Sequence, residues 1–370
     1  MFKKVLVLIA FVFIALACSS SDDGSGNTSD NFDRTALLTN WADNIIVPIY
    51  DDLNTLLADL VVKKDAFVTT PNQTTLNEFR TSWYNAYKVW QYAEMFNIGR
   101  AEEINFAFQM NIYPTNVSDI QSNIESQSYD LTNVNNNDAV GFPALDYMLY
   151  GLADDDADIL EFYTTNTEAS KYLTYASDLT NQMKALTQDV TSNWSTYRQT
   201  FINKTNNTVT GSLNKLVNDF IYYYEKGLRA NKIGIPAGNF STTPLPEKVE
   251  GYYRNDVSKA LATEAMGAVK DFFNGKAYTS NVTDESLASY LDYLNTIKNG
   301  EDLSVLINDQ FDTAQANIDS LDDSFTNQIN SDNTKMTETF DALQMAVVLL
   351  KVDMLQAINI SVDYVDADGD

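Results

Sequence analysis

The sequence predicts an all-α fold made of two packed helical bundles. Apolar residues recur at steps of three and four over long segments, which places them on one face of a helix. Segments that alternate apolar and polar residues, as strands do, are scarce outside the tail at 359–365. Clusters of Asn, Pro and Gly separate the periodic segments. Long helices joined by short loops are typical of bundles.

The first 17 residues have the features of a secretory signal. Lys3 and Lys4 precede an apolar run that ends at Ala17, shorter than the roughly 20 residues that a spanning helix needs. The only cysteine of the chain, Cys18, follows at once, and this order resembles the signal of a bacterial lipoprotein. The resemblance implies cleavage before Cys18 and its acylation, and therefore an outer-membrane lipoprotein at the cell surface or facing the periplasm. An ordinary signal with an incidental cysteine is the alternative.

Residues 18–31 are expected to form a flexible tether. They are almost entirely small or polar and cannot bury enough apolar surface to fold. The acidic run at 21–24 resembles a signal that moves some lipoproteins to the cell surface, and a solvated linker is an equal reading.

The helices follow in order along the rest of the chain. Long helices are expected near 33–67, 73–98, 168–203, 208–232, 246–274 and 334–360, and shorter ones near 115–126, 142–150, 284–298 and 302–320. Their clearest apolar stripes contain Leu76, Phe79, Trp83, Tyr87, Trp90 and Ala93 in the first bundle, and Leu213, Leu216, Val217, Phe220, Ile221 and Tyr224 in the second.

Asn-rich residues 203–207 mark the expected boundary between a bundle at 32–205 and one at 206–370. A long non-helical connection is expected from Gly234 through Pro236 to Pro246, because Gly and Pro interrupt helices.

Composition excludes several classes of function. The formal charge of −27 opposes binding to nucleic acid or to anionic lipid head groups. The chain contains no histidine, so a Ser-His-Asp site or a histidine-containing zinc site cannot be built. A metal site here would have to use oxygen ligands.

The segment 141–151 contains the strongest candidate motif. Gly141 opens a predicted helix, Pro143 suits its first turn, and Asp146 favours the positive end of the helix dipole. On these residues alone, a well-capped buried helix explains the pattern.

At this point the chain resembles the imelysin family, also called peptidase M75. The family motif Gly-x-His-x-x-Glu aligns with Gly141, Pro143 and Asp146, so proline replaces the histidine and aspartate replaces the glutamate. The matching segments elsewhere are 83–96 with Trp83, Trp90 and Glu94, 112–114 with Tyr113, 232–238 with Lys232, 249–253 with Glu250, and the ending 366–370.

The resemblance implies two helical bundles, with the motif and the second-bundle signature meeting near their interface. It also implies secretion, frequent lipidation, and a link to bacterial iron uptake. One member of the family was described as a peptidase. Proline has no side-chain donor or acceptor, so an activity that needs the motif imidazole is not expected here.

The residues matched by the resemblance are the candidate site. The expected ligand-binding residues are Gly141, Pro143, Asp146, Glu94, Tyr113, Lys232 and Glu250. The three carboxylates Glu94, Asp146 and Glu250 would hold an oxygen-ligated cation, iron or calcium, if they converge. Alternatively, Glu94 and Glu250 form structural ion pairs with Arg229, Lys232 or Arg254.

The function expected from these observations is that of a lipid-anchored extracytoplasmic binding protein. It would capture a small ligand or metal at the interface of the bundles, in iron or other metal acquisition. One alternative is a metallopeptidase that uses Asp146 or Glu94 as general base. Another is a surface scaffold for glycans or proteins, with Tyr113 and Tyr252 exposed.

Overall fold

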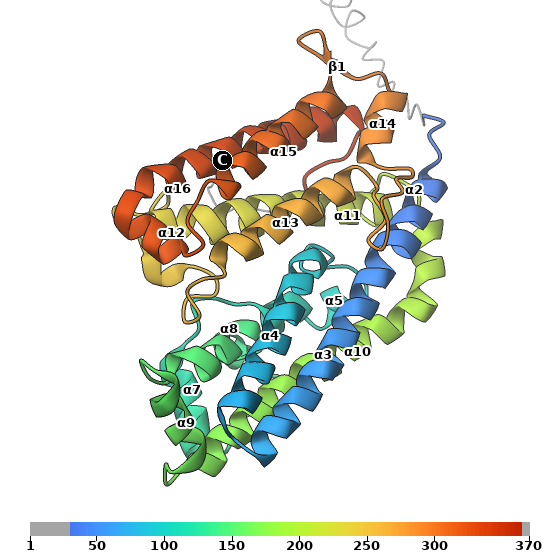
Figure 1. Ribbon diagram of the computed structural model, residues 1–370. Coiled ribbons are helices and arrows are strands. Elements are labelled where there is room, and N and C mark those ends of the chain that lie inside the picture. The colour runs from blue at the N-terminus through green and yellow to red at the C-terminus, as the bar shows by residue number, and fades with distance from the viewer. Residues whose placement is uncertain (1–29, 365–370) are drawn as a thin grey trace, which may run out of the picture. The chain divides into compact units, whose positions relative to one another are not determined.

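The computed structural model describes residues 30–364. The expected signal at 1–17, the lipidation site Cys18, all but the end of the tether 18–31, and the ending 366–370 lie outside the described residues. The helical prediction is confirmed, because helices carry nearly all the regular structure of the part described (Figure 1).

The described residues form several long helices with shorter helical segments between them. In the first half they are α2 (Arg34–Asn40), η1 (Trp41–Ile46), α3 (Val47–Thr69), α4 (Gln73–Ala93), α5 (Arg100–Glu103), α6 (Phe106–Met110), α7 (Val117–Ser126), η2 (Val134–Ala139), α8 (Gly141–Asp146), η3 (Tyr147–Gly151), α9 (Asp156–Thr164) and α10 (Ala169–Asn203). In the second half they are α11 (Ser212–Tyr222), η4 (Tyr223–Gly234), α12 (Ile235–Ala237), η5 (Pro246–Lys248), α13 (Ser258–Phe273), α14 (Leu287–Tyr293), β1 (Ile297–Lys298), β2 (Glu301–Asp302), α15 (Leu303–Asp319), α16 (Phe325–Val348), η6 (Leu349–Met354) and α17 (Leu355–Ala357).

Helix α3 packs between α4 and α10 in the first half (Figure 1). Helix α4 begins where Asn72 and Thr75 form a reciprocal capping box, which satisfies two N–H groups that the first turn leaves free. Its predicted apolar stripe is confirmed, since every member from Leu76 to Ala93 is at most 2% exposed. This stripe is the face on which the candidate site is built.

Helices α13, α15 and α16 pack together in the second half, with α16 also against η4 (Figure 1). The predicted stripe from Leu213 to Tyr224 is confirmed as fully buried. Helix α13 packs on α4, and Trp41 stacks on Phe272 with ring centroids 4.7 Å apart.

The described residues from Asp33 onward belong to one compact unit. The division into bundles at 32–205 and 206–370 stays a prediction. Within residues 30–364, no helix combines the length and the apolar character needed to cross a membrane.

The helix expected at 246–274 is wrong at its beginning. Helix α13 starts only at Ser258, and residues 249–257 form an irregular loop. Gly251 has φ +70° and Asn255 φ +66°, which are left-handed values that a right-handed helix does not contain. Apolar residues continue at helical spacing through this loop, so the sequence pattern does not reveal it. The loop forms one wall of the site.

Two other local expectations are wrong. The connection expected from 234 is helical through Ala237, because the helical course of η4 continues into α12 and ends only where Gly238 adopts a left-handed φ of +89°. The helix expected at 284–298 ends at Tyr293, and β1 pairs antiparallel with β2 through Ile297 and Asp302. Each strand has only two residues, too few for a visible alternating pattern.

Candidate functional site

The motif helix α8 is fixed by close contacts with two earlier segments. Gly141 has φ +74°, and a Cβ at this position would lie 2.1 Å from the carbonyl oxygen of Met110. Trp83 Nε1 donates to the Phe142 carbonyl at 3.2 Å, and the Tyr87 ring stacks on the Phe142 ring at 4.5 Å. The glycine of the motif is therefore required by backbone packing.

Asp146 joins the motif helix to the loop at 249–257. Its Oδ2 accepts the backbone N–H of Tyr253 at 2.9 Å, and its Oδ1 accepts that of Arg254 at 3.0 Å. The side chain is buried, and burial raises its pKa to about 7 although both amide hydrogen bonds oppose the rise. The Asp146 carboxylate thus binds two successive backbone N–H groups and holds the loop at 249–257 against the motif helix. We call this double contact the Asp146 fork.

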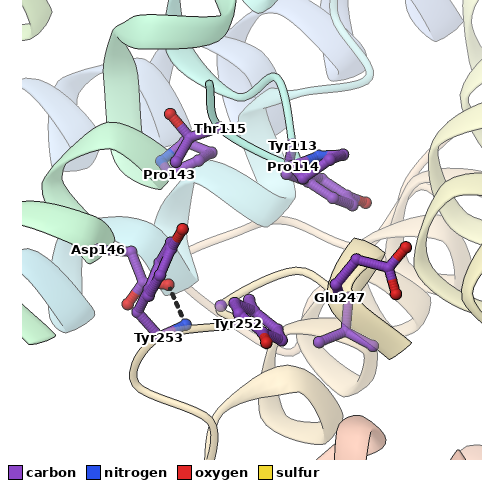
Figure 2. Close-up of a pocket in the computed structure, with 10 residues that line it drawn as sticks. Tyr113, Pro114, Thr115, Pro143, Asp146, Glu247, Tyr252 and Tyr253 are labelled. Carbon is purple, nitrogen blue, oxygen red and sulfur yellow. Dashed lines mark hydrogen bonds between the residues drawn. The ribbon is translucent and has the colours of Figure 1, made fainter. Parts of the chain in front are cut away.

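A pocket of about 220 Å³ lies where this fork joins the two segments. We call it the tyrosine pocket. It is lined by Tyr113, Pro114, Thr115, Pro143, Asp146, Glu247, Val249, Gly251, Tyr252 and Tyr253. Figure 2 shows the labelled side chains around an open centre, with Tyr113 and Pro114 across from Tyr252 and Tyr253.

Contacts with Tyr147 and Gly151 hold Tyr253 in place. Its ring packs on that of Tyr147 at 5.1 Å, and a Cβ on Gly151 would lie 2.3 Å from Tyr253 Cδ1. The Tyr252 ring is 5.1 Å from that of Tyr253 at an interplanar angle of 80°. The two rings therefore form a right-angled corner of the pocket.

A second group of polar residues lies behind Tyr113, and we call it the Lys232 cluster. It contains Gln91, Glu94, Asn111, Lys232 and Glu250. Lys232 Nζ donates to Gln91 Oε1 at 2.6 Å and to the Glu250 carboxylate, and it lies 3.9 Å from Glu94 Oε2. Glu250 also accepts from Asn111 at 2.8 Å and from Gln91 at 3.2 Å.

The charged side chains of the Lys232 cluster are largely shielded from solvent. The side chains of Lys232 and Glu250 are each 2% exposed, and that of Glu94 is 14% exposed. Burial raises the pKa of the Glu94 carboxyl to about 7, with Glu250 adding to the rise and Lys232 opposing it. Near neutral pH the cluster therefore exchanges a proton at Glu94 rather than carrying two fully charged acids beside one cation.

The predicted site residues divide between these two places. Pro143, Asp146 and Tyr113 line the tyrosine pocket, and Glu94, Lys232 and Glu250 form the cluster. Tyr113 connects the two, because its ring centroid is 6.0 Å from Lys232 Nζ. Gly141 acts through the backbone and lines neither.

The three carboxylates proposed for a cation do not form one group. Among residues 30–364 no three Asp, Glu, His or Cys side chains lie close enough to hold a metal ion. Asp146 is engaged with backbone amides, while the ammonium of Lys232 already contacts Glu94 and Glu250. This arrangement does not fit a bound metal, and it matches the alternative of a structural ion pair.

The sequence does not single out several site residues. Gln91 is one of them, although a signal exists: Tyr87, Gln91 and Glu94 recur at helical spacing on a face that is otherwise apolar. Asn111, Thr115 and Glu247 have no such signal. Asn111 and Thr115 lie in irregular segments, and Glu247 lies in the short 3-10 helix η5.

Comparison with known proteins identifies the family of the chain. The family model described as imelysin, peptidase M75, matches residues 46–354. The chain belongs to the imelysin family. No curated protein matches the chain.

Two solved structures share the fold. An imelysin-like protein from Psychrobacter arcticum has a TM-score of 0.69 and 17% identity, with 90% of this chain and 99% of that chain covered. A protein described as a candidate iron-regulated protein A precursor from Parabacteroides distasonis has a TM-score of 0.70 and 17% identity, with 89% and 97% covered. At this identity the likeness concerns the fold, and the motif of this imelysin-family chain remains without its histidine.

Proposed function

We propose that this imelysin-family chain is a lipid-anchored extracytoplasmic binding protein that captures a small ligand in the tyrosine pocket. The observation that carries the proposal is the pocket itself, which the Asp146 fork builds from the motif helix and the loop at 249–257. Ligand sites in proteins are typically concave and mostly apolar, with a few placed polar groups. The tyrosine pocket has this composition.

The role of the ligand is proposed to lie in iron or other metal acquisition. Support comes from the name of the Parabacteroides distasonis protein, which refers to iron regulation. The lipid anchor is proposed to be at Cys18, at the outer membrane, on the cell surface or on the periplasmic side. A tethered binding protein of this kind would keep its captured ligand close to the cell.

A complementation experiment tests this function. The gene is deleted in the parent bacterium, and uptake of radioactive iron is measured under iron limitation. We expect uptake to fall, and to be restored by the wild-type chain but not by Thr115→Trp, whose indole would fill the pocket that Thr115 lines. Thr174→Trp, at an exposed position of α10, is the matched control and should restore uptake.

Two results would count against the proposal. Unchanged iron uptake in the deletion strain would remove the role in metal acquisition. Full restoration by Thr115→Trp would remove the tyrosine pocket from the function. The anchor is tested separately: Cys18→Ala should move the protein from the membrane fraction to the soluble extracytoplasmic fraction, and retention in the membrane would contradict acylation at Cys18.

A further inference from the structure

The residues that line the tyrosine pocket limit the chemical class of its ligand. Three of its ten lining residues are tyrosines and two are carboxylates, while none is lysine or arginine. The chain as a whole carries a formal charge of −27. A cleft that has the exposed carboxylate of Glu247 in its lining, in a strongly acidic protein, concentrates cations and repels anions.

Two cations close to the pocket, Lys232 and Arg254, do not give its lining a positive charge. Lys232 lies behind Tyr113, does not line the pocket, and is neutralised by Glu250. The Arg254 guanidinium is 4.1 Å from the Tyr84 ring centroid and donates to Asp256. These two positive charges are therefore already matched by carboxylates, and Lys248, which stands between the lining residues Glu247 and Val249, does not itself line the pocket.

The three aromatic rings of the lining offer surface to which an alkylated cation can bind. Tyr252 and Tyr253 form a right-angled corner, and Tyr113 stands across from it (Figure 2). The faces of aromatic rings attract cations within about 6 Å of their centroids, and cages of such rings recognise quaternary ammonium groups. Glu247 lies on the lining with an exposed side chain that can approach the same charge.

The hydrogen-bond acceptors in the pocket favour an alkylated ammonium group over a primary one. A primary ammonium has three N–H donors that need acceptors when it leaves water. Asp146 is the most buried carboxylate of the pocket, and both its oxygens already accept backbone N–H groups. An alkylated ammonium has few or no donors to satisfy and gains contact with the rings instead.

We propose that the tyrosine pocket binds an alkylated ammonium group, held by the rings of Tyr113, Tyr252 and Tyr253 and by the charge of Glu247. This inference rests on the proposed function and names the chemistry of its ligand. The pocket volume of about 220 Å³ corresponds to roughly seven water molecules, enough for a trimethylammonium head and a short chain. The inference concerns the group that enters the pocket, whatever larger molecule carries it.

Three ligands of one shape test the inference by titration calorimetry on the folded chain. Choline carries the cation, 3,3-dimethylbutan-1-ol is its neutral carbon isostere, and 3,3-dimethylbutanoate presents the same branched head with a negative charge. We expect saturable binding of choline, at least tenfold weaker binding of the alcohol, and no binding of the anion. The choline affinity should fall as salt concentration rises.

Variants assign the binding to the pocket. Tyr252→Leu removes one ring from a side chain that is 37% exposed, and we expect it to weaken choline binding at least about fivefold. Tyr293→Leu, which removes a ring that is 53% exposed on α14, is the matched control and should leave binding unchanged. Glu247→Gln should weaken choline binding while Glu78→Gln, an exposed carboxylate on α4, should not.

The outcomes separate this inference from the proposed function. Equal or tighter binding of the neutral alcohol would overturn the choice of a cation while leaving a small-ligand pocket in place. Choline binding that survives Tyr252→Leu, or that Tyr293→Leu abolishes, would place the cation elsewhere. Absence of binding by all three ligands would overturn the inference, and the uptake defect of Thr115→Trp would then decide the proposed function alone.

Discussion

Replacing Lys232 with methionine tests whether the Lys232 cluster is a balanced ion-pair network. Methionine keeps most of the side-chain volume and removes the charge. At an effective dielectric constant near 20, unit charges 4 Å apart interact by about 4 kcal/mol, and Lys232 Nζ lies 3.9 Å from Glu94 and in hydrogen-bond contact with Glu250. Removing one partner of a buried ion pair costs about 3–5 kcal/mol. We expect Lys232→Met to lower the free energy of unfolding by that amount at pH 7.5.

The loss should depend on pH and on Glu250. Without the cation the folded-state pKa of Glu94 should rise further above its unfolded value, so the variant regains stability as pH falls and this carboxylate becomes neutral. In the double variant Lys232→Met/Glu250→Gln, the amide oxygen of the introduced glutamine can still accept from Gln91 and Asn111. The double variant should therefore be at least about 2 kcal/mol more stable than the two single losses added together.

Urea unfolding followed by far-UV circular dichroism, at pH 7.5 and pH 5.5, measures these differences. Lys335→Met, at an exposed position of α16, is the control and should change stability by less than about 0.5 kcal/mol. A loss below about 1 kcal/mol in Lys232→Met, or strictly additive losses in the double variant, would refute the ion-pair explanation of the cluster.

Three further predictions concern the Asp146 fork and the motif glycine. Wild-type stability should rise by at least about 2 kcal/mol as pH falls from 8 to 5, because Asp146 and Glu94 both have folded pKa values of about 7 against unfolded values near 4, so the folded chain holds protons that the unfolded chain releases; urea titrations that show no such rise would contradict it. Asp146→Asn turns one acceptor into a donor that faces a backbone N–H, so it should lower the free energy of unfolding by about 1–3 kcal/mol at pH 5. It should also speed amide hydrogen exchange at Tyr253 and Arg254 and reduce the pH dependence of stability. Unchanged exchange would mean that Asp146 does not hold the loop. Gly141→Ala should unfold or severely destabilise the protein in a thermal melt, whereas Gly300→Ala, at φ +91° with nothing within 4 Å of the new Cβ, should show only the modest cost of its backbone; similar melting temperatures for both would remove the contact with Met110 as the cause.

The fold could be predicted because it depends on repeated spacing. The stripe from Leu76 to Ala93 recurs along most of α4, and every member is buried as its spacing requires. The beginnings of helices were less readable where apolar spacing continued past a break. Gly251 has a positive φ that a right-handed helix does not contain, and a Cβ at this position would lie 2.4 Å from Val257 Cγ2, so only glycine fits.

The candidate site could be predicted only in part. Family resemblance brought together Asp146, Tyr113 and Pro143, which do line one pocket, and Glu94, Lys232 and Glu250, which do form one cluster. The separation of the two groups could not be foreseen. It arises because Glu250 points toward Lys232 while its neighbours Val249 and Gly251 line the pocket, and side-chain direction in an irregular loop has no period to read.

A crystal structure with arsenocholine tests most directly whether the tyrosine pocket is the binding site. Arsenic replaces the nitrogen of choline, so its anomalous scattering marks the position of the cation without reliance on the shape of the density. We expect one strong arsenic peak within about 6 Å of the ring centroids of Tyr113, Tyr252 and Tyr253. An arsenic peak at another place on the molecule, or none in the pocket at a concentration that saturates binding in solution, would contradict the proposal.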